Sequence, residues 1–241
     1  MSDIVIREVT NNIWTFSRPF ALLGVFNIGG RSTAIKLRDG GVWVLASTPL
    51  SPETKAKLDE LGPVKFIVAS NAVHNLYLGD FKRAYPDAKL IAPAAAVSRC
   101  SDKTLSFDGV WGEDPVDTKY GFEDDIQACY FSAFSNKDVA FFHPESATLI
   151  QADLLVNLPG TEQYSKSQST GSFPWWGPIG KPYGWVQKKF LSARVQDPVT
   201  MKRDVEIVAG WKFARIIPCH GDVIETDGNT VWREAYKPYL D

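Results

Sequence analysis

Short runs rich in apolar, β-branched and aromatic residues alternate with polar turns in the N-terminal third of the chain. The runs cover residues 4–9, 12–17, 32–37 and 42–47, and this composition is typical of β-strands. Asp39-Gly40 lies between the last two runs, and Asp-Gly is a strong hairpin signal. The pattern therefore predicts an antiparallel meander.

The pattern then changes to an alternation of strands and helices. Ser51 followed by Pro52 is a helix start, and Gly62-Pro63 ends that helix. "KFIVAS" (65–70) and "KLIAP" (89–93) predict buried strands, and residues 76–85 and 94–99 predict helices. This part of the chain is predicted to be mixed α/β.

The second half repeats this layout. Runs at 126–134, 139–143 and 147–153 predict a second antiparallel meander, with His143 exposed in the turn before the last run. Helices are expected at 184–193, 200–212 and within 230–240, and a strand at 214–218. The whole chain, 1–241, is predicted to be a single domain. An aromatic-rich segment at about 158–200 is predicted to form an inserted lid, because long irregular segments in compact domains are often functional.

Composition narrows the possible partners. The chain has 241 residues and a net charge of −2, without a cluster of Lys and Arg among stacking aromatics, so a small molecule is a better partner than nucleic acid. Its three cysteines are widely spaced and predict free thiols. The sequence shows neither a secretory signal nor a membrane span, and we expect a cytoplasmic protein.

Three apolar strands lead to side chains that can bind a metal. "KFIVAS" leads to His74, "ATLIQAD" ends on Asp153 and "ARIIPCH" ends on His220. In α/β sheets ligands bind beyond the carboxyl ends of the strands. Two imidazoles and a carboxylate suit zinc, iron or manganese, so these residues are the candidate site.

At these positions the sequence resembles the metallo-β-lactamase superfamily. The segments "GGVWVLAST", "FIVASNAVHNLYLGDFKRAYPDAKLIAP", "TLIQADLLVN" and "IIPCHGD" are similar to its hairpin strand, its first metal motif, its bridging-aspartate strand and its last histidine strand. In more detail the chain resembles a branch described only as a domain of unknown function. The resemblance implies a four-layer αββα sandwich.

The sequence departs from that family at most ligand positions. An active member has His-x-His-x-Asp-His, and this chain has Ala72, His74, Leu76 and Tyr77 at those four positions. The next expected histidine falls near Phe134 and is absent, whereas the resemblance places Asp153 at the bridging position and His220 at the last histidine. A dinuclear zinc centre does not fit this set.

Three interpretations remain open. In the first, His74, Asp153 and His220 hold one divalent ion, and the protein hydrolyses an ester, thioester or lactone of an apolar compound. In the second, a metal-free lyase or isomerase uses these residues as acid and base. In the third, the cleft only binds a ligand.

Further residues are assigned around this centre. Tyr77 is a candidate catalytic residue beside the two histidines and the aspartate. The candidate substrate-binding residues, some of them in the predicted lid, are Asn71, Asn75, Phe134, Trp175 and Trp176.

Overall fold

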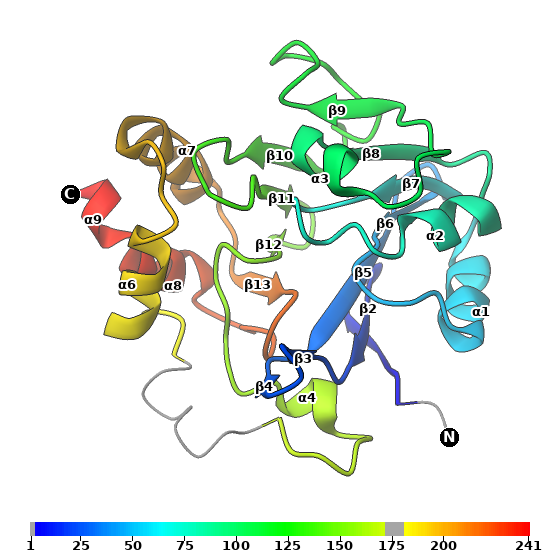
Figure 1. Ribbon diagram of the computed structural model, residues 1–241, viewed down its shortest axis with the longest axis horizontal. Coiled ribbons are helices and arrows are strands. Elements are labelled where there is room, and N and C mark those ends of the chain that lie inside the picture. Colours follow the sequence, from blue (N-terminus) through cyan, green and yellow to red (C-terminus); the bar gives the residue numbers. More distant parts are fainter. Residues whose placement is uncertain (1–2, 172–180) are drawn as a thin grey trace.

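Two β-sheets packed face to face form the centre of the computed structural model, which describes residues 3–171 and 181–241 (Figure 1). The seven-stranded sheet contains, in spatial order, β1 (Val5–Thr10), β2 (Ile13–Arg18), β5 (Gly30–Lys36), β6 (Val42–Leu45), β7 (Val64–Val68), β8 (Lys89–Pro93) and β9 (Gly109–Trp111). The four-stranded sheet contains β10 (Gln127–Tyr130), β11 (Val139–His143), β12 (Thr148–Gln151) and β13 (Arg215–Pro218). A small separate hairpin is made of β3 (Ala21–Leu22) and β4 (Phe26–Asn27).

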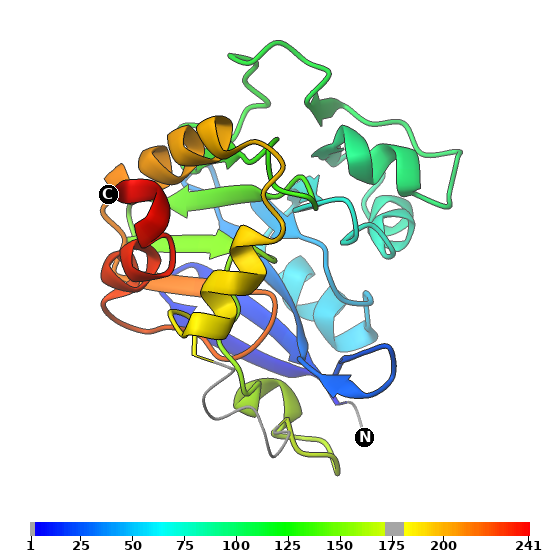
Figure 2. The ribbon, with the colours of Figure 1, turned by 60° about the vertical axis from the view of Figure 1, so that its left-hand side comes forward.

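Helices cover the outer face of each sheet (Figure 2). The seven-stranded sheet is covered by α1 (Pro52–Leu61), α2 (Leu78–Ala84) and α3 (Ala94–Arg99). The four-stranded sheet is covered by α6 (Trp185–Ser192), α7 (Pro198–Gly210), α8 (Gly228–Ala235) and α9 (Lys237–Leu240), and the short α4 (Thr161–Tyr164) packs near β2. The αββα sandwich is thus confirmed. Among the described helices, none has the length and apolar character needed to cross a bilayer.

Strands buried on both faces explain the continuous apolar runs in the sequence. In β6, Trp43 and Leu45 point into the core between the sheets, whereas Val42 and Val44 point toward the helices. The same division applies to β11, where successive side chains enter different cores. The layers are therefore encoded by apolar side chains on both faces of the central strands.

Local signals place the element ends where the sequence predicted them. The Ser51 hydroxyl accepts a hydrogen bond from the Thr54 N–H at 3.1 Å, Pro52 occupies the first helical position, and Gly62 follows the last turn of α1. Strands β1, β2, β5 and β6 form the first antiparallel meander, and β10, β11 and β12 form the second. Both predicted meanders are confirmed.

Two expectations for the second meander were wrong. The strand expected at 126–134 stops at Tyr130, because the chain turns and the Phe131 N–H bonds to the Asp138 carbonyl at 2.8 Å. His143 is the last residue of β11 and only 3% exposed, with Nδ1 2.8 Å from the Ser146 hydroxyl. Its burial lowers its pKa. The side chain is enclosed because the strand continues one residue further than the turn signal suggested.

Strand pairing brings the candidate ligands to one edge of the sandwich. Strands β12 and β13 are parallel, with Gln151 opposite Pro218. Asp153 and His220 each lie two residues beyond this pair, so they leave the sheet side by side and on the same face. β7 ends in the other sheet at Val68, and the following loop carries His74 to the same edge.

Candidate metal centre

His74, Asp153 and His220 meet beyond the ends of three strands. Asp153 Oδ1 lies 3.6 Å from His74 Nε2 and 3.3 Å from His220 Nε2. The two imidazole rings are 5.3 Å apart between centroids. One potential ligand atom from each residue lies within 4.8 Å of the others. Segments 79 and 67 residues apart in the chain thus form one cluster.

Two amides fix the Asp153 carboxylate. Its Oδ2 accepts hydrogen bonds from Asn71 Nδ2 at 2.9 Å and from Asn136 Nδ2 at 2.6 Å, which leaves Oδ1 directed at the imidazoles. Burial would raise the pKa of Asp153, but His74 and His220 hold it well below its usual value. Burial and the nearby Asp153 charge raise the pKa of Asp138, the second carboxyl bonded to Asn71. Of the two carboxyls, Asp153 therefore has the lower pKa and the stronger tendency to carry the negative charge.

A backbone carbonyl determines the tautomer of His220. Its Nδ1 lies 2.6 Å from the Gly29 carbonyl oxygen, which can only accept, so Nδ1 carries the hydrogen. In a neutral ring Nε2 then presents a lone pair to Asp153 Oδ1 at 3.3 Å. Two lone pairs facing one another repel, so this geometry requires a proton or a metal ion between them.

His74 is oriented by a turn built on Asn71. The Asn71 Oδ1 accepts hydrogen bonds from the N–H groups of Val73 at 2.9 Å and His74 at 3.1 Å. Burial alone would lower the pKa of His74, but its interactions with Cys219 and Asp153 raise it well above the ordinary value. The Cys219 thiol itself donates to the Arg31 carbonyl in the core between the sheets.

A buried cation holds the loop that carries His220. Arg31 is fully buried, and its Nη1 donates to the carbonyls of Pro218 at 2.6 Å and Gly221 at 2.7 Å. Glu162 of α4 balances the charge at 3.3 Å from Nη2. Burial lowers the pKa of Arg31. His220 is thereby fixed from both sides, since the carbonyls that flank it are both bound.

Two glycines allow this close packing. Gly29 has φ +71°, and a Cβ there would lie 1.8 Å from the side-chain oxygen of Gln163. Gly221 has φ +90°, and a Cβ there would lie 2.0 Å from the Asn157 carbonyl oxygen. At both positions any other residue is disfavoured, because its backbone would need a positive φ and its Cβ would clash with the neighbouring atoms. The Gly29-Gly30 turn thus supplies the acceptor for His220.

The cluster lies on the wall of a cavity of about 650 Å³, a size suited to a small organic ligand. Tyr77 lines this cavity, as do Asn136 and Arg194. Arg194 Nη1 donates to Asn136 Oδ1 at 3.2 Å, and its guanidinium lies over the Phe190 ring at 4.1 Å. Most of the remaining wall is apolar and consists of Phe20, Leu22, Phe26, Ile28, Val73, Leu76, Val156, Leu158, Val186 and Phe190.

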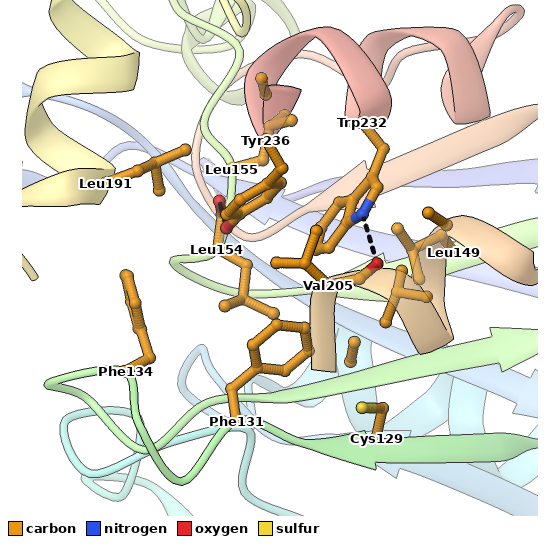
Figure 3. Packing of buried hydrophobic residues seen from close by; sticks show 14 of the residues in the cluster. Cys129, Phe131, Phe134, Leu149, Leu154, Leu155, Leu191, Val205, Trp232 and Tyr236 are labelled. Carbon is orange, nitrogen blue, oxygen red and sulfur yellow. Dashed lines mark hydrogen bonds between the residues drawn. The ribbon is translucent and has the colours of Figure 1, made fainter. Parts of the chain in front are cut away.

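The structure places the predicted substrate-binding residues in different surroundings. Asn71 is fully buried behind Asp153, and Asn75 bonds to the Ala72 carbonyl at 2.8 Å; neither lines the cavity. Phe134 is fully buried in the core between the four-stranded sheet and its helices, near Leu191 and Leu154 (Figure 3). It therefore has no surface to offer a ligand. Trp175 and Trp176 lie outside the described residues.

Asn136 is the site residue that sequence reasoning missed. It follows Phe134 by two positions in the turn from 131 to 138, and its amide bonds Asp153 while its oxygen bonds Arg194. The resemblance pointed to this turn but not to the side chain that faces the site. The polar run "SNKD" after an apolar strand was the available signal.

The donor set fits one metal ion. Two imidazole nitrogens and one carboxylate oxygen converge, and the partners behind them match the usual second layer of a metal site, a carbonyl on His Nδ1 and amides on the carboxylate. Among the described residues, only this group of three such donors converges, and for a second ion Ala72 offers no donor atom and Leu76 is apolar. The residues fit a mononuclear centre and not a dinuclear one.

The molecule has the metallo-β-lactamase fold with a reduced ligand set. It aligns with a metallo-β-lactamase from Pontibacter korlensis (11% identity, 99% of both chains, TM-score 0.61) and with one from Hirschia baltica (12% identity, 99% and 98% of the chains, TM-score 0.62). It also aligns with FIM-1 from Pseudomonas aeruginosa in its mono-zinc form (13% identity, 100% and 98%, TM-score 0.61).

Within this fold the chain belongs to the family described as a domain of unknown function, DUF4336, whose model matches residues 10–168. No curated protein matches the sequence. The fold is that of a hydrolase family, and the identities of 11–13% establish the fold alone.

Proposed function

We propose that this protein is a small-molecule hydrolase in which His74, Asp153 and His220 hold one divalent metal ion. The observation that carries the proposal is the convergence of three donors whose orientations are fixed from behind, on the wall of an apolar cavity. The substrate is an ester, thioester or lactone of a small apolar compound.

Each part of the site has a role in this proposal. When bound, the ion polarises a carbonyl group and lowers the pKa of water. Asp153 supplies the negative charge that retains a cation, and His220 is held in one tautomer by Gly29. The Tyr77 hydroxyl is available to bind the substrate from the cavity wall. The apolar wall binds the substrate body and excludes water from it.

Arg194 adds a specificity element. Among the described residues no carboxylate pairs with it, although it lines the cavity one amide away from Asp153. An unpaired guanidinium in an apolar cavity favours a ligand with a negative group. We therefore propose that the substrate also carries a carboxylate or a similar anion, close to the bond that is cleaved.

A metal-free lyase or isomerase is the second candidate. The raised pKa of His74 favours it, because the neighbouring Asp153 carboxylate, 3.6 Å from Nε2, stabilises the protonated ring. An imidazolium on a cavity wall can donate a proton to a substrate. In this case Asp153 Oδ1 and the two Nε2 atoms share protons instead of a metal ion.

Metal content and turnover together test the proposal. The protein is purified without a metal-binding tag, analysed for zinc, iron and manganese, and assayed on acyl esters, thioesters and lactones before and after chelation. His74→Ala and His220→Ala are compared with His143→Gln, a variant of the third histidine, which lies outside the cavity.

We expect about one metal ion per chain in the parent protein. His74→Ala and His220→Ala should lose both the ion and the hydrolysis, whereas His143→Gln should keep both. Turnover that survives complete metal removal but is lost in His74→Ala supports the acid-base alternative. Saturable binding without turnover of any substrate class overturns both enzymatic candidates.

A further inference from the structure

Exposed apolar side chains are concentrated around the cavity mouth. Of the thirteen large apolar residues exposed in the described part of the chain, ten lie in three short segments. We call these ten residues the apolar rim: Phe20, Leu22, Leu23, Val25, Phe26, Val73, Leu76, Tyr183, Trp185 and Phe190. The other three are scattered over distant loops and helix α7.

The three segments belong to one surface because each of them lines the same cavity. Leu22 of the β3–β4 hairpin, Leu76 of the loop before α2 and Phe190 of α6 all form its wall. Figure 1 shows the hairpin at the lower edge of the sandwich, near α4, and α6 on the side of the four-stranded sheet. The rim is therefore continuous with the candidate metal centre.

The hairpin tip projects its apolar side chains away from the protein. Leu23 is 83% exposed and has φ +53°, and Val25 is 59% exposed. Trp185 of α6, next in the chain to the cavity-lining Val186, is 71% exposed. Contiguous exposed apolar surface of this kind marks an interaction site, because leaving it in water is unfavourable.

Positive charge accompanies the rim. Residues 181–196 contain four cations and no acidic residue, in a chain whose net charge is −2. Lys181, Lys189 and Arg194 have no ion-pair partner among the described residues, and Lys188 lies 3.9 Å from Glu234. The hairpin segment 18–28 contains no acidic residue, and its one cation, Arg18, is paired with Asp3 at 3.3 Å. The unpaired charge of residues 181–196 is thus opposite in sign to the net charge of the chain.

We propose that the apolar rim docks on an anionic lipid surface, with the hairpin tip and Trp185 inserted and the lysines of α6 at the headgroups. Apolar side chains flanked by cations are the usual composition of such a surface. Pairing of two copies through this face would oppose cation to cation, which disfavours a homodimer. Docking would open the cavity toward the lipid phase, where apolar compounds are concentrated.

Vesicle binding tests this proposal without any assay of activity. The result is therefore independent of whether the candidate metal centre binds an ion. The full-length protein is co-sedimented with phosphatidylcholine vesicles with and without phosphatidylglycerol. The variants are Leu23→Asp at the tip and Lys189→Glu on α6. Matched controls on other surfaces are Val116→Asp and Lys212→Glu, and thermal unfolding verifies that all four fold.

We expect binding to vesicles with phosphatidylglycerol that weakens with salt. Leu23→Asp should weaken it about tenfold or more, since an inserted leucine is lost. Lys189→Glu should weaken it at least about fivefold on anionic vesicles only. The controls should bind like the parent.

No binding to either vesicle, or equal losses in the controls, overturns the proposal. Light scattering that shows a dimer dissociated by Leu23→Asp also overturns it and assigns the rim to a second copy of the chain.

Discussion

The amide of Asn136 provides the sharpest test of the candidate centre. Its Nδ2 bonds Asp153 Oδ2 at 2.6 Å, at the edge of the cavity rather than in the core. A hydrogen bond to a charged group contributes about 1.5–3 kcal/mol, and loss of a partner behind a metal ligand typically weakens metal affinity about 10- to 100-fold. Asn136→Ala should therefore raise the zinc dissociation constant by about that factor, while Asn71 keeps the carboxylate partly oriented.

Zinc is titrated into the metal-free protein together with a chelator of known affinity, and the competition gives the zinc dissociation constant of each variant. Arg194→Met is the matched control, because Arg194 bonds Asn136 from the other side and lines the same cavity without touching Asp153. Its zinc affinity should stay within about twofold of the parent. Equal zinc affinities in Asn136→Ala and the parent would refute the role given to this amide. A parent protein that binds no zinc, iron or manganese would refute the metal centre itself.

Three further predictions concern residues away from the ligands. Phe134→Ala should lower the free energy of unfolding by about 3–5 kcal/mol in a denaturant titration, because the ring is fully buried; an altered KM at unchanged stability would contradict the core assignment. Arg31→Met should lower the free energy of unfolding by about 3–5 kcal/mol, because the Pro218 and Gly221 carbonyls lose their donor and Glu162 keeps only Arg7 as a cationic partner, with Arg31→Lys intermediate; full stability in Arg31→Met would rule this out. Burial lowers the pKa of His143, so the folded state binds its proton less readily than the unfolded state. The associated stability is present above the unfolded pKa of about 6.5 and is lost as the pH falls through the folded value. Stability curves between about pH 7 and 5 should therefore fall less in His143→Gln than in the parent, and parallel curves would disprove this contribution.

The reduced ligand set of this chain limits the number of metal ions that the site can hold. Ala72 and Leu76 cannot bind an ion, and the histidine that the resemblance implies near Phe134 is missing. The neutral amides of Asn71 and Asn136 donate hydrogen bonds to Asp153 instead. A site with one carboxylate and two imidazoles retains at most one ion. Its chemistry then depends on the cavity wall as much as on the cluster, which is why Tyr77 and Arg194 enter the proposed function.

The sequence by itself predicted most of the elements and the candidate ligands. The β-type runs, the Ser51-Pro52 helix start and Asp39-Gly40 are local signals, which can be interpreted without knowledge of the rest of the chain. The candidate ligands could be found because Asp153 and His220 closely follow two apolar strands, which pair in parallel and end at a common edge, and His74 lies in the loop after a third apolar strand.

Only the tertiary structure decided which side chains support the ligands. Whether Phe134 or Asn136 faces the cavity depends on how the turn after β10 packs against α6 and Asp153, which no local pattern encodes. Arg31 appears in the sequence as one polar residue beside a glycine turn, and its role arises because β13 ends next to β5 in space, 187 residues later in the chain. Hydrogen-bond partners far apart in the sequence are selected by packing, and packing is a property of the whole fold.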